Sequence, residues 1–172
     1  QVISTETQHA YSLINRILTI SKSQAGKLEL KKVQVDMTSM LSKMEENFKV
    51  NRLKNVSFEN HINCQYAFAD EEYLKEIFYN LIDNSIKYSD GDVTIRISTD
   101  KVDKGVSIRV RDNGIGISKA DQKVIFDKYE RASAAKRTFK KKGAPGFGLG
   151  LTYVFQVIDA HEGMIGVESE LG

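Results

Sequence analysis

"DEEYLKEIFYNLIDNSIKYSD", residues 70–90, is the stretch that decides the fold of this chain of 172 residues. Its apolar residues recur every three or four positions, which is the spacing of one buried face of an α-helix. They are Leu74, Ile77, Phe78, Leu81, Ile82 and Ile86. Asp70 precedes them and belongs to the residue types that cap helix N-termini. We therefore predict a helix that begins after Asp70 and runs to about Tyr88.

A second row of side chains on this helix is polar. Glu76, Asn80, Asn84 and Lys87 follow one another at steps of four, four and three. Asparagine is a mediocre helix former, so two of them one turn apart cost helix stability without adding to the core. The row is typical of a solvated face. It also suits a nucleotide, because amide oxygens bind Mg²⁺ and a lysine ammonium binds phosphate. Both interpretations stay open on this row alone.

The segments around this helix predict a mixture of strands and helices. Strands are expected near residues 33–35, 55–62 and 163–170, a hairpin over residues 92–100 and 105–112, and further helices near residues 37–48 and 146–161. Helices and strands alternate only loosely along the chain, and a hairpin is present. The predicted class is therefore α+β, a two-layer α/β sandwich in which helices cover one face of a mixed sheet.

The N-terminal segment predicts another helix, from about His9 to Gly26, with a wide apolar face. One stripe has the spacing of a coiled-coil seam: Tyr11, Ile14, Leu18, Ser21, Ala25 and Leu28. A second stripe lies beside it: Leu13, Ile17 and Ile20. A face of this width has to be covered, either by a partner helix in a bundle or by the chain's own domain. We expect the bundle, because Gly26 ends the helix before the rest of the fold begins.

The composition is that of an ordinary globular protein, with 41% hydrophobic and 28% charged residues. The net charge of +2 gives no strong attraction to nucleic acid. Cys64 is the only cysteine, which excludes an intramolecular disulfide and favours a reducing cytoplasm over export. No apolar run approaches the roughly 20 residues of a membrane span. We therefore expect a cytoplasmic protein without a membrane segment.

A second stretch whose residues could bind a ligand is "IRVRDNGIGIS", residues 108–118. A strand runs into Asp112, whose carboxylate can accept a hydrogen bond from an exocyclic amine. Gly114 and Gly116 then allow the backbone to approach a flat ring. A tight turn after an edge strand explains the same residues, because Asp-Asn-Gly favours turns.

"KKGAPGFGLGLTYV", residues 141–154, is the third. No Gly-Lys-Ser/Thr follows the glycines, which excludes a P-loop, and the alternation of Gly146, Gly148 and Gly150 excludes the dinucleotide fingerprint. What remains is glycine-rich backbone that leads into a helix N-terminus, an anion-binding feature. The basic run before it, residues 131–142, fits a phosphate lid or a solvated loop.

In this order and spacing the motifs resemble the catalytic ATP-binding domain of sensor histidine kinases, within the GHKL ATPase superfamily. "NLIDNSIKYSD" resembles the N box, "RDNGIGIS" the G1 box, "IFDKYERAS" the F box and "GFGLGL" the G2 box. "LINRILTISKSQAGKLEL" resembles the second dimerisation helix and its exit. The resemblance implies the Bergerat fold of that superfamily. It also implies a partial dimerisation domain over residues 1–28 and an ATP-binding domain over residues 29–172 that lacks its final strand.

The resemblance implies a role at each matching position. Asn84 would coordinate Mg²⁺, with Asn80 beside it near the γ-phosphate and Lys87 on phosphate. Tyr88 would pack near the adenine or ribose, and Asp112 would take the adenine amino group. Phe126 and Tyr129 would anchor the lid. The implied catalytic residues are thus Asn80, Asn84 and Lys87, and the further ATP-binding residues are Tyr88, Asp112, Gly114, Gly116, Ile117, Phe126, Arg131, Gly146, Phe147, Gly148, Leu149 and Gly150.

One position discriminates among the activities of the superfamily. Relatives that hydrolyse ATP carry a glutamate one turn before the Mg²⁺ asparagine, where this chain has Asn80. Asparagine is no general base for water, which favours phosphoryl transfer to a protein side chain. The alternatives are a GHKL-type ATPase, a serine kinase of the anti-sigma type, and a degenerate module that only dimerises or docks.

The phosphoacceptor histidine of the family has no match here. His9, His61 and His161 all lack the sequence pattern that surrounds it. The resemblance therefore implies an acceptor helix outside these residues, a response regulator receiver domain as partner, and a homodimer in the full-length protein. It allows the chain to be the cytoplasmic part of a membrane-bound sensor.

Overall fold

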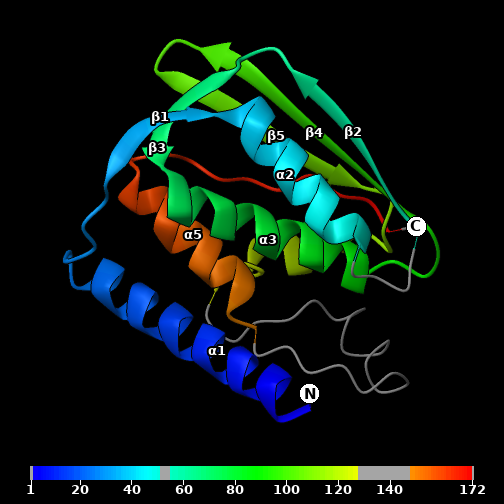
Figure 1. Ribbon diagram of the computed structural model, residues 1–172, viewed down its shortest axis with the longest axis horizontal. Coiled ribbons are helices and arrows are strands. Elements are labelled where there is room, and N and C mark those ends of the chain that lie inside the picture. Colours follow the sequence, from blue (N-terminus) through cyan, green and yellow to red (C-terminus); the bar gives the residue numbers. More distant parts are fainter. Residues whose placement is uncertain (1, 51–54, 128–147, 172) are drawn as a thin grey trace. The chain divides into compact units, whose positions relative to one another are not determined.

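The computed structural model describes residues 2–50, 55–127 and 148–171. Figure 1 shows the helices and strands along the chain. The helices are α1 (Val2–Gln24), α2 (Met37–Val50), α3 (Glu71–Lys87) and α5 (Gly150–Ala160), with a short 3₁₀ helix at Asp121–Lys123. The strands are β1 (Lys32–Asp36), β2 (Val56–Ile62), β3 (Tyr66–Asp70), β4 (Val93–Val102) and β5 (Gly105–Asp112). The chain divides into two compact units, residues 1–30 with 117–169 and residues 31–116 with 170–172.

The unit that contains residues 31–116 is built on two sheets. β1 and β3 pair antiparallel, with Val35 opposite Ala67. In the second sheet β2 runs parallel to β4, and β4 pairs antiparallel with β5. The predicted hairpin and the predicted mixed sheet are therefore confirmed.

The core of this unit lies between one face of the larger sheet and the helices α2 and α3 (Figure 1). Successive side chains of a strand point to opposite faces, and β4 follows this rule: Val93, Ile95, Ile97 and Thr99 are buried. They meet side chains from α2 and α3: Met37, Met40, Leu41, Met44, Phe48, Leu74, Phe78, Ile82 and Ile86. The predicted α+β sandwich, with helices on one face of the sheet, is confirmed.

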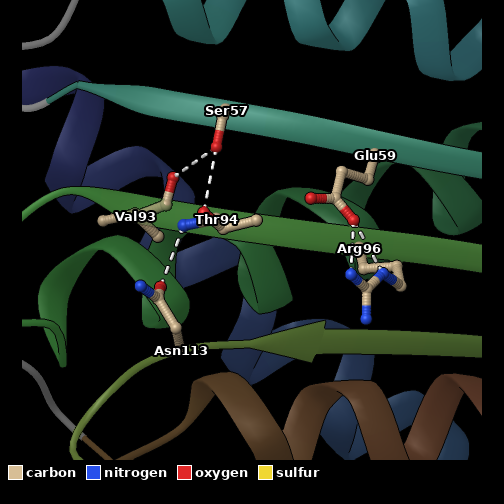
Figure 2. A network of polar contacts seen from close by, with 6 residues as sticks. All are labelled: Ser57, Glu59, Val93, Thr94, Arg96 and Asn113. Carbon is tan, nitrogen blue, oxygen red and sulfur yellow. Dashed lines mark hydrogen bonds and ion pairs between the residues drawn. The ribbon is translucent and has the colours of Figure 1, made fainter.

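The other face of this sheet is polar (Figure 2). Glu59 on β2 accepts two hydrogen bonds from the guanidinium group of Arg96 on β4, at 2.8 Å from Nε and 2.5 Å from Nη2. The hydroxyl oxygens of Ser57 and Thr94 lie 3.1 Å apart in the next row. The alternation between apolar and polar faces fixes the register, because a slip by one residue would turn the apolar side chains outward.

The other unit contains α1 and α5, which contact each other. Ser23 on α1 donates a hydrogen bond to the Gln156 carbonyl on α5 at 3.2 Å. Ile20 on α1 is buried. Three other apolar side chains of α1 are roughly half exposed: Ile14 at 55%, Ile17 at 46% and Leu18 at 51%. No helix within the described part of the chain is long and apolar enough to cross a lipid bilayer.

The structure differs from the predicted elements at residues 163–170. That segment was expected to be a strand, but the structure gives it no regular secondary structure. Ser169 makes two hydrogen bonds that involve a side chain: Gln122 Nε2 donates to the Ser169 carbonyl at 2.8 Å, and Ser169 Oγ accepts from the Ile117 amide at 2.9 Å. The Gly163 amide donates to the Ile158 carbonyl at 2.9 Å, which is a turn contact and not a strand ladder. β3 was not predicted. The first helix was predicted to begin at about His9, whereas α1 begins at Val2. The predicted domain boundary at residues 28 and 29 stays a prediction.

Asp70 determines where α3 begins. Its Oδ1 accepts hydrogen bonds from the amides of Glu72 and Tyr73, both at 3.2 Å, which satisfies two N–H groups that the first helical turn leaves free. Its Oδ2 accepts the Lys31 amide at 2.8 Å. The predicted N-cap is confirmed, and the same carboxylate ties the segment before β1 to the start of the helix.

We predict that Asp70→Ala lowers the free energy of unfolding by about 1 to 2 kcal/mol, because the helix loses its cap and three partly buried amides lose their acceptor. Urea-induced unfolding followed by circular dichroism measures this change. Asp103→Ala, in the exposed turn between β4 and β5, is the control and should have little effect. Equal stability of the two variants would contradict the capping role.

Candidate functional site

The polar row of α3 is not uniformly solvated. Asn80 is only 4% exposed, and its Nδ2 donates to the Glu76 carbonyl at 2.8 Å. Its Oδ1 has no hydrogen-bond partner among the residues that the structure describes. A buried amide oxygen without a donor is costly, so this atom is suited to accept from a ligand.

Asn84 follows Asn80 by one turn of α3. Its side chain is partly buried and makes no hydrogen bond within the described ranges 2–50, 55–127 and 148–171. Two asparagine amides thus lie on one side of the helix. Amide oxygens are hard ligands of the kind that Mg²⁺ takes in proteins, so these residues fit a Mg²⁺ ion that also binds phosphate oxygens.

Lys87 occupies the last turn of α3. Its Nζ lies 2.5 Å from Oδ2 of Asp83, four residues earlier on the same helix, and both side chains are partly exposed. The lysine for which a phosphate contact was predicted is therefore held by a carboxylate of its own helix. A phosphate that takes Lys87 has to compete with Asp83.

Asp112 ends β5 and lies in the same unit as α3. Its Oδ2 lies 3.0 Å from the hydroxyl oxygen of Ser85 on α3, and its Oδ1 accepts the amide of Gly114 at 2.8 Å. Ser85 was not among the predicted site residues. The one signal for it was a hydroxyl residue beside Ile86 on the side of the helix that is otherwise apolar.

The loop at residues 112–116 is fastened to the C-terminal end of α3. The Tyr88 carbonyl accepts the Ile115 amide at 2.9 Å. A Cβ atom at Gly114 would lie 2.8 Å from both this carbonyl oxygen and Oδ1 of Asp112, so a larger residue does not fit. Gly116 has a φ of 71°, and a Cβ there would collide with the Glu170 carbonyl oxygen.

The Asn113 side chain fastens this loop to β4 (Figure 2). Its Oδ1 accepts the Thr94 amide at 2.9 Å, and its Nδ2 donates to the Asp92 carbonyl at 3.2 Å. The side chain thereby continues the β4–β5 ladder by one position beyond Asp112. Asp112 thus stands between an anchored strand end and an anchored loop, which limits how far its backbone can move.

The structure brings seven of the predicted site residues into one compact unit: Asn80, Asn84, Lys87, Tyr88, Asp112, Gly114 and Gly116. Five others belong to the second unit: Ile117, Phe126, Gly148, Leu149 and Gly150. In that unit Phe126 packs near Phe155 of α5, with ring centroids 6.3 Å apart, and Leu149 immediately precedes α5. Four predicted residues lie outside the described residues: Tyr129, Arg131, Gly146 and Phe147.

The three histidines occupy different elements. His61 lies on β2 and is exposed, and His161 follows α5 with its Nδ1 2.7 Å from the Val157 carbonyl oxygen. His9 lies in α1, and its side chain is outside the described part of the structure.

Residues 69–172, more than half of the chain, match the family described as histidine kinase-, DNA gyrase B-, and HSP90-like ATPase. Sensor protein RprX of Bacteroides fragilis is 33% identical over 99% of this chain and 33% of its own length. Sensor histidine kinase WalK of Bacillus subtilis is 28% identical over 98% of this chain and 28% of its own length. The chain thus spans about a third or less of these curated relatives.

Solved structures agree with this family. The full-length ShkA structure in complex with AMPPNP has a TM-score of 0.76 at 26% identity, over 95% of this chain and 34% of that one. The histidine kinase AdeS of Acinetobacter baumannii has a TM-score of 0.72 at 22% identity, over 92% of this chain and 71% of that one, which shows a shared fold. This chain therefore belongs to the family of histidine kinase-, DNA gyrase B- and HSP90-like ATPases.

Proposed function

We propose that this chain is the ATP-binding catalytic part of a sensor histidine kinase, with the second dimerisation helix over residues 1–28 and the ATP-binding domain over residues 29–172. The observation that carries the proposal is the arrangement around Asp112. Its carboxylate is oriented by the Ser85 hydroxyl and the Gly114 amide. Ser85 follows Asn84 directly on α3, so the carboxylate lies near the asparagine proposed to bind Mg²⁺. The solved relative ShkA, whose structure contains AMPPNP, supports a nucleoside triphosphate as the ligand.

Each predicted site residue in the unit that contains α3 then has a role in nucleotide binding. Asp112 accepts the amino group of adenine, and Tyr88 packs near the adenine or ribose. Asn84 supplies an oxygen to Mg²⁺, Asn80 lies near the γ-phosphate, and Lys87 binds phosphate. Gly114 and Gly116 let the loop approach the base.

The phosphate lid in this proposal rests on the resemblance to the histidine kinase family. Ile117 begins the segment that leads toward the lid, Phe126 anchors it, and Arg131 reaches the phosphates. The lid ends, and α5 begins, at a glycine-rich segment: Gly146, Phe147, Gly148, Leu149 and Gly150. The N-terminal amides of α5 favour an anion.

A Mg²⁺ ion fits the donors that are present. Among the described residues no three His, Cys, Asp or Glu side chains gather as a metal site. Mg²⁺ is commonly bound through few protein oxygens together with substrate phosphates, and the side-chain amide of Asn84 offers such an oxygen. The bound ion would neutralise phosphate charge.

Phosphoryl transfer to histidine is the reaction that we favour over hydrolysis. The buried Asn80 side chain has no basic group with which to activate water. The γ-phosphate would pass to a histidine on a separate acceptor helix and from there to a response regulator receiver domain. The location that this scheme requires is the cytoplasm.

A homodimer in the full-length protein is part of the proposal. Ile14, Ile17 and Leu18 expose about half of their side chains on α1, at the three- and four-residue spacing of a helix contact. Such a stripe suits the helix bundle through which the acceptor histidine would be presented.

We predict that the chain binds MgATP and that Asp112→Asn weakens this binding by about 10- to 100-fold, because a hydrogen bond to a carboxylate is lost. Isothermal titration calorimetry measures both affinities. Asp103→Asn is the matched control. Equal affinity of wild type and Asp112→Asn would reject the adenine contact.

We predict that Asn84→Ala weakens MgATP binding by at least about tenfold and leaves ATP binding in EDTA unchanged, because only the metal ligand is removed. Asn60→Ala, at an exposed position of β2, is the control. A loss of similar size with and without Mg²⁺ would argue against metal binding by Asn84.

We predict that the chain does not phosphorylate itself when incubated with labelled ATP, since none of its histidines has the acceptor pattern. Acid-labile, alkali-stable label on His9, His61 or His161, located by mass spectrometry, would overturn this prediction. Rapid release of ADP would favour an ATPase instead, and absence of ATP binding would favour a non-catalytic module.

A further inference from the structure

We propose that Ser85 is a positioning residue: its hydroxyl sets the orientation of the Asp112 carboxylate and thereby the preference for adenine over a 6-oxo purine. The inference rests on the proposed binding of a nucleotide at Asp112. It concerns a contact between residues 27 positions apart in the sequence, from the buried side of α3 to the end of β5.

The Ser85 hydroxyl has one proton and two acceptors within reach. Its Oγ lies 3.0 Å from the Leu81 carbonyl oxygen and 3.0 Å from Oδ2 of Asp112. In an α-helix the Leu81 carbonyl already accepts the backbone amide of residue 85. If the proton pointed to Leu81, an oxygen lone pair of Ser85 would face the negative carboxylate. The proton therefore goes to Asp112, where the hydrogen bond is charge-assisted and stronger.

The location of Ser85 makes this hydrogen bond specific. The residue is 4% exposed, so water does not readily replace the hydroxyl as donor. Oδ1 of the same carboxylate accepts the Gly114 amide at 2.8 Å. Donors on two different elements thus hold the two oxygens, and together they fix the rotation of the carboxylate about its terminal bond.

The fixed carboxylate discriminates between bases. Each carboxylate oxygen has two lone pairs, so the two donors leave acceptor sites on Asp112, which is exposed to solvent. An amino group at position 6 of a purine donates to such a site. A 6-oxo group cannot donate a hydrogen bond. Its oxygen is an acceptor, so it would face another acceptor on the carboxylate. The discrimination is greatest when Asp112 cannot rotate away.

The experiment compares ATP with inosine triphosphate, which carries an oxygen in place of the 6-amino group. The affinity of the whole chain for each, in Mg²⁺ buffer, is measured by calorimetry. We expect wild type to prefer ATP, and Ser85→Ala to reduce the ratio of the two affinities about fivefold, the size of one lost hydrogen bond. Alanine suits a helix and is slightly smaller than serine, so α3 should persist.

Two variants separate positioning from stability. Thr99→Val removes a fully buried hydroxyl, which donates to the Cys64 carbonyl at 2.8 Å, without touching Asp112. It should lower stability and leave the ATP preference unchanged. Ser85→Cys has a weak donor of similar size and should give an intermediate preference, which keeps the test available if Ser85→Ala unfolds.

The double variant Ser85→Ala with Asp112→Asn tests the route of the effect. If Ser85 acts through Asp112, removing its hydroxyl changes the preference in wild type but not in the Asp112→Asn background. An equal effect in both backgrounds, or an unchanged ratio in Ser85→Ala, would overturn the inference alone. If wild type binds neither triphosphate, the proposed function itself fails, and the inference fails with it.

Discussion

The attachment of the loop at residues 112–116 to the C-terminal end of α3 is the constraint on which the candidate site depends. The Tyr88 carbonyl accepts the Ile115 amide, and Gly114 comes so close that no side chain fits there. The sheet positions Asp112 beside α3, because β5 pairs with β4 and the buried face of β4 packs toward α3. The acidic group and the amides of α3 therefore share one rigid frame.

Much of the fold could be predicted because its signals are local. The apolar spacing and the cap at Asp70 determine α3 without reference to distant residues. The hairpin of β4 and β5 is a contact between neighbours in sequence, and its alternating residues carry their own register. The motifs that indicated the family follow one another along the chain, so their order and spacing could be recognised from the sequence alone.

The remainder depends on contacts between distant residues. β3 is five residues long, and its partner β1 ends 30 positions before it begins, so alternation alone could not identify it. Residues 163–170 were expected to form a strand, but the hydrogen bonds of Ser169 go to the Ile117 amide and the Gln122 side chain, about 50 positions earlier in the sequence. Ser85 was missed for the same reason, since only the folded chain brings it to Asp112. The burial of Asn80 also could not be seen in a row that looked solvated.

The ion pair of Lys87 with Asp83 has a consequence for the kind of anion that the site accepts. Lys87 carries its own counter-ion, so an incoming anion gains only the difference between two ion pairs. A singly charged anion such as chloride gains little from that exchange. A polyphosphate that also engages other groups can displace Asp83 at small net cost. The pair thus favours anions that engage several groups at once over small anions that meet Lys87 alone.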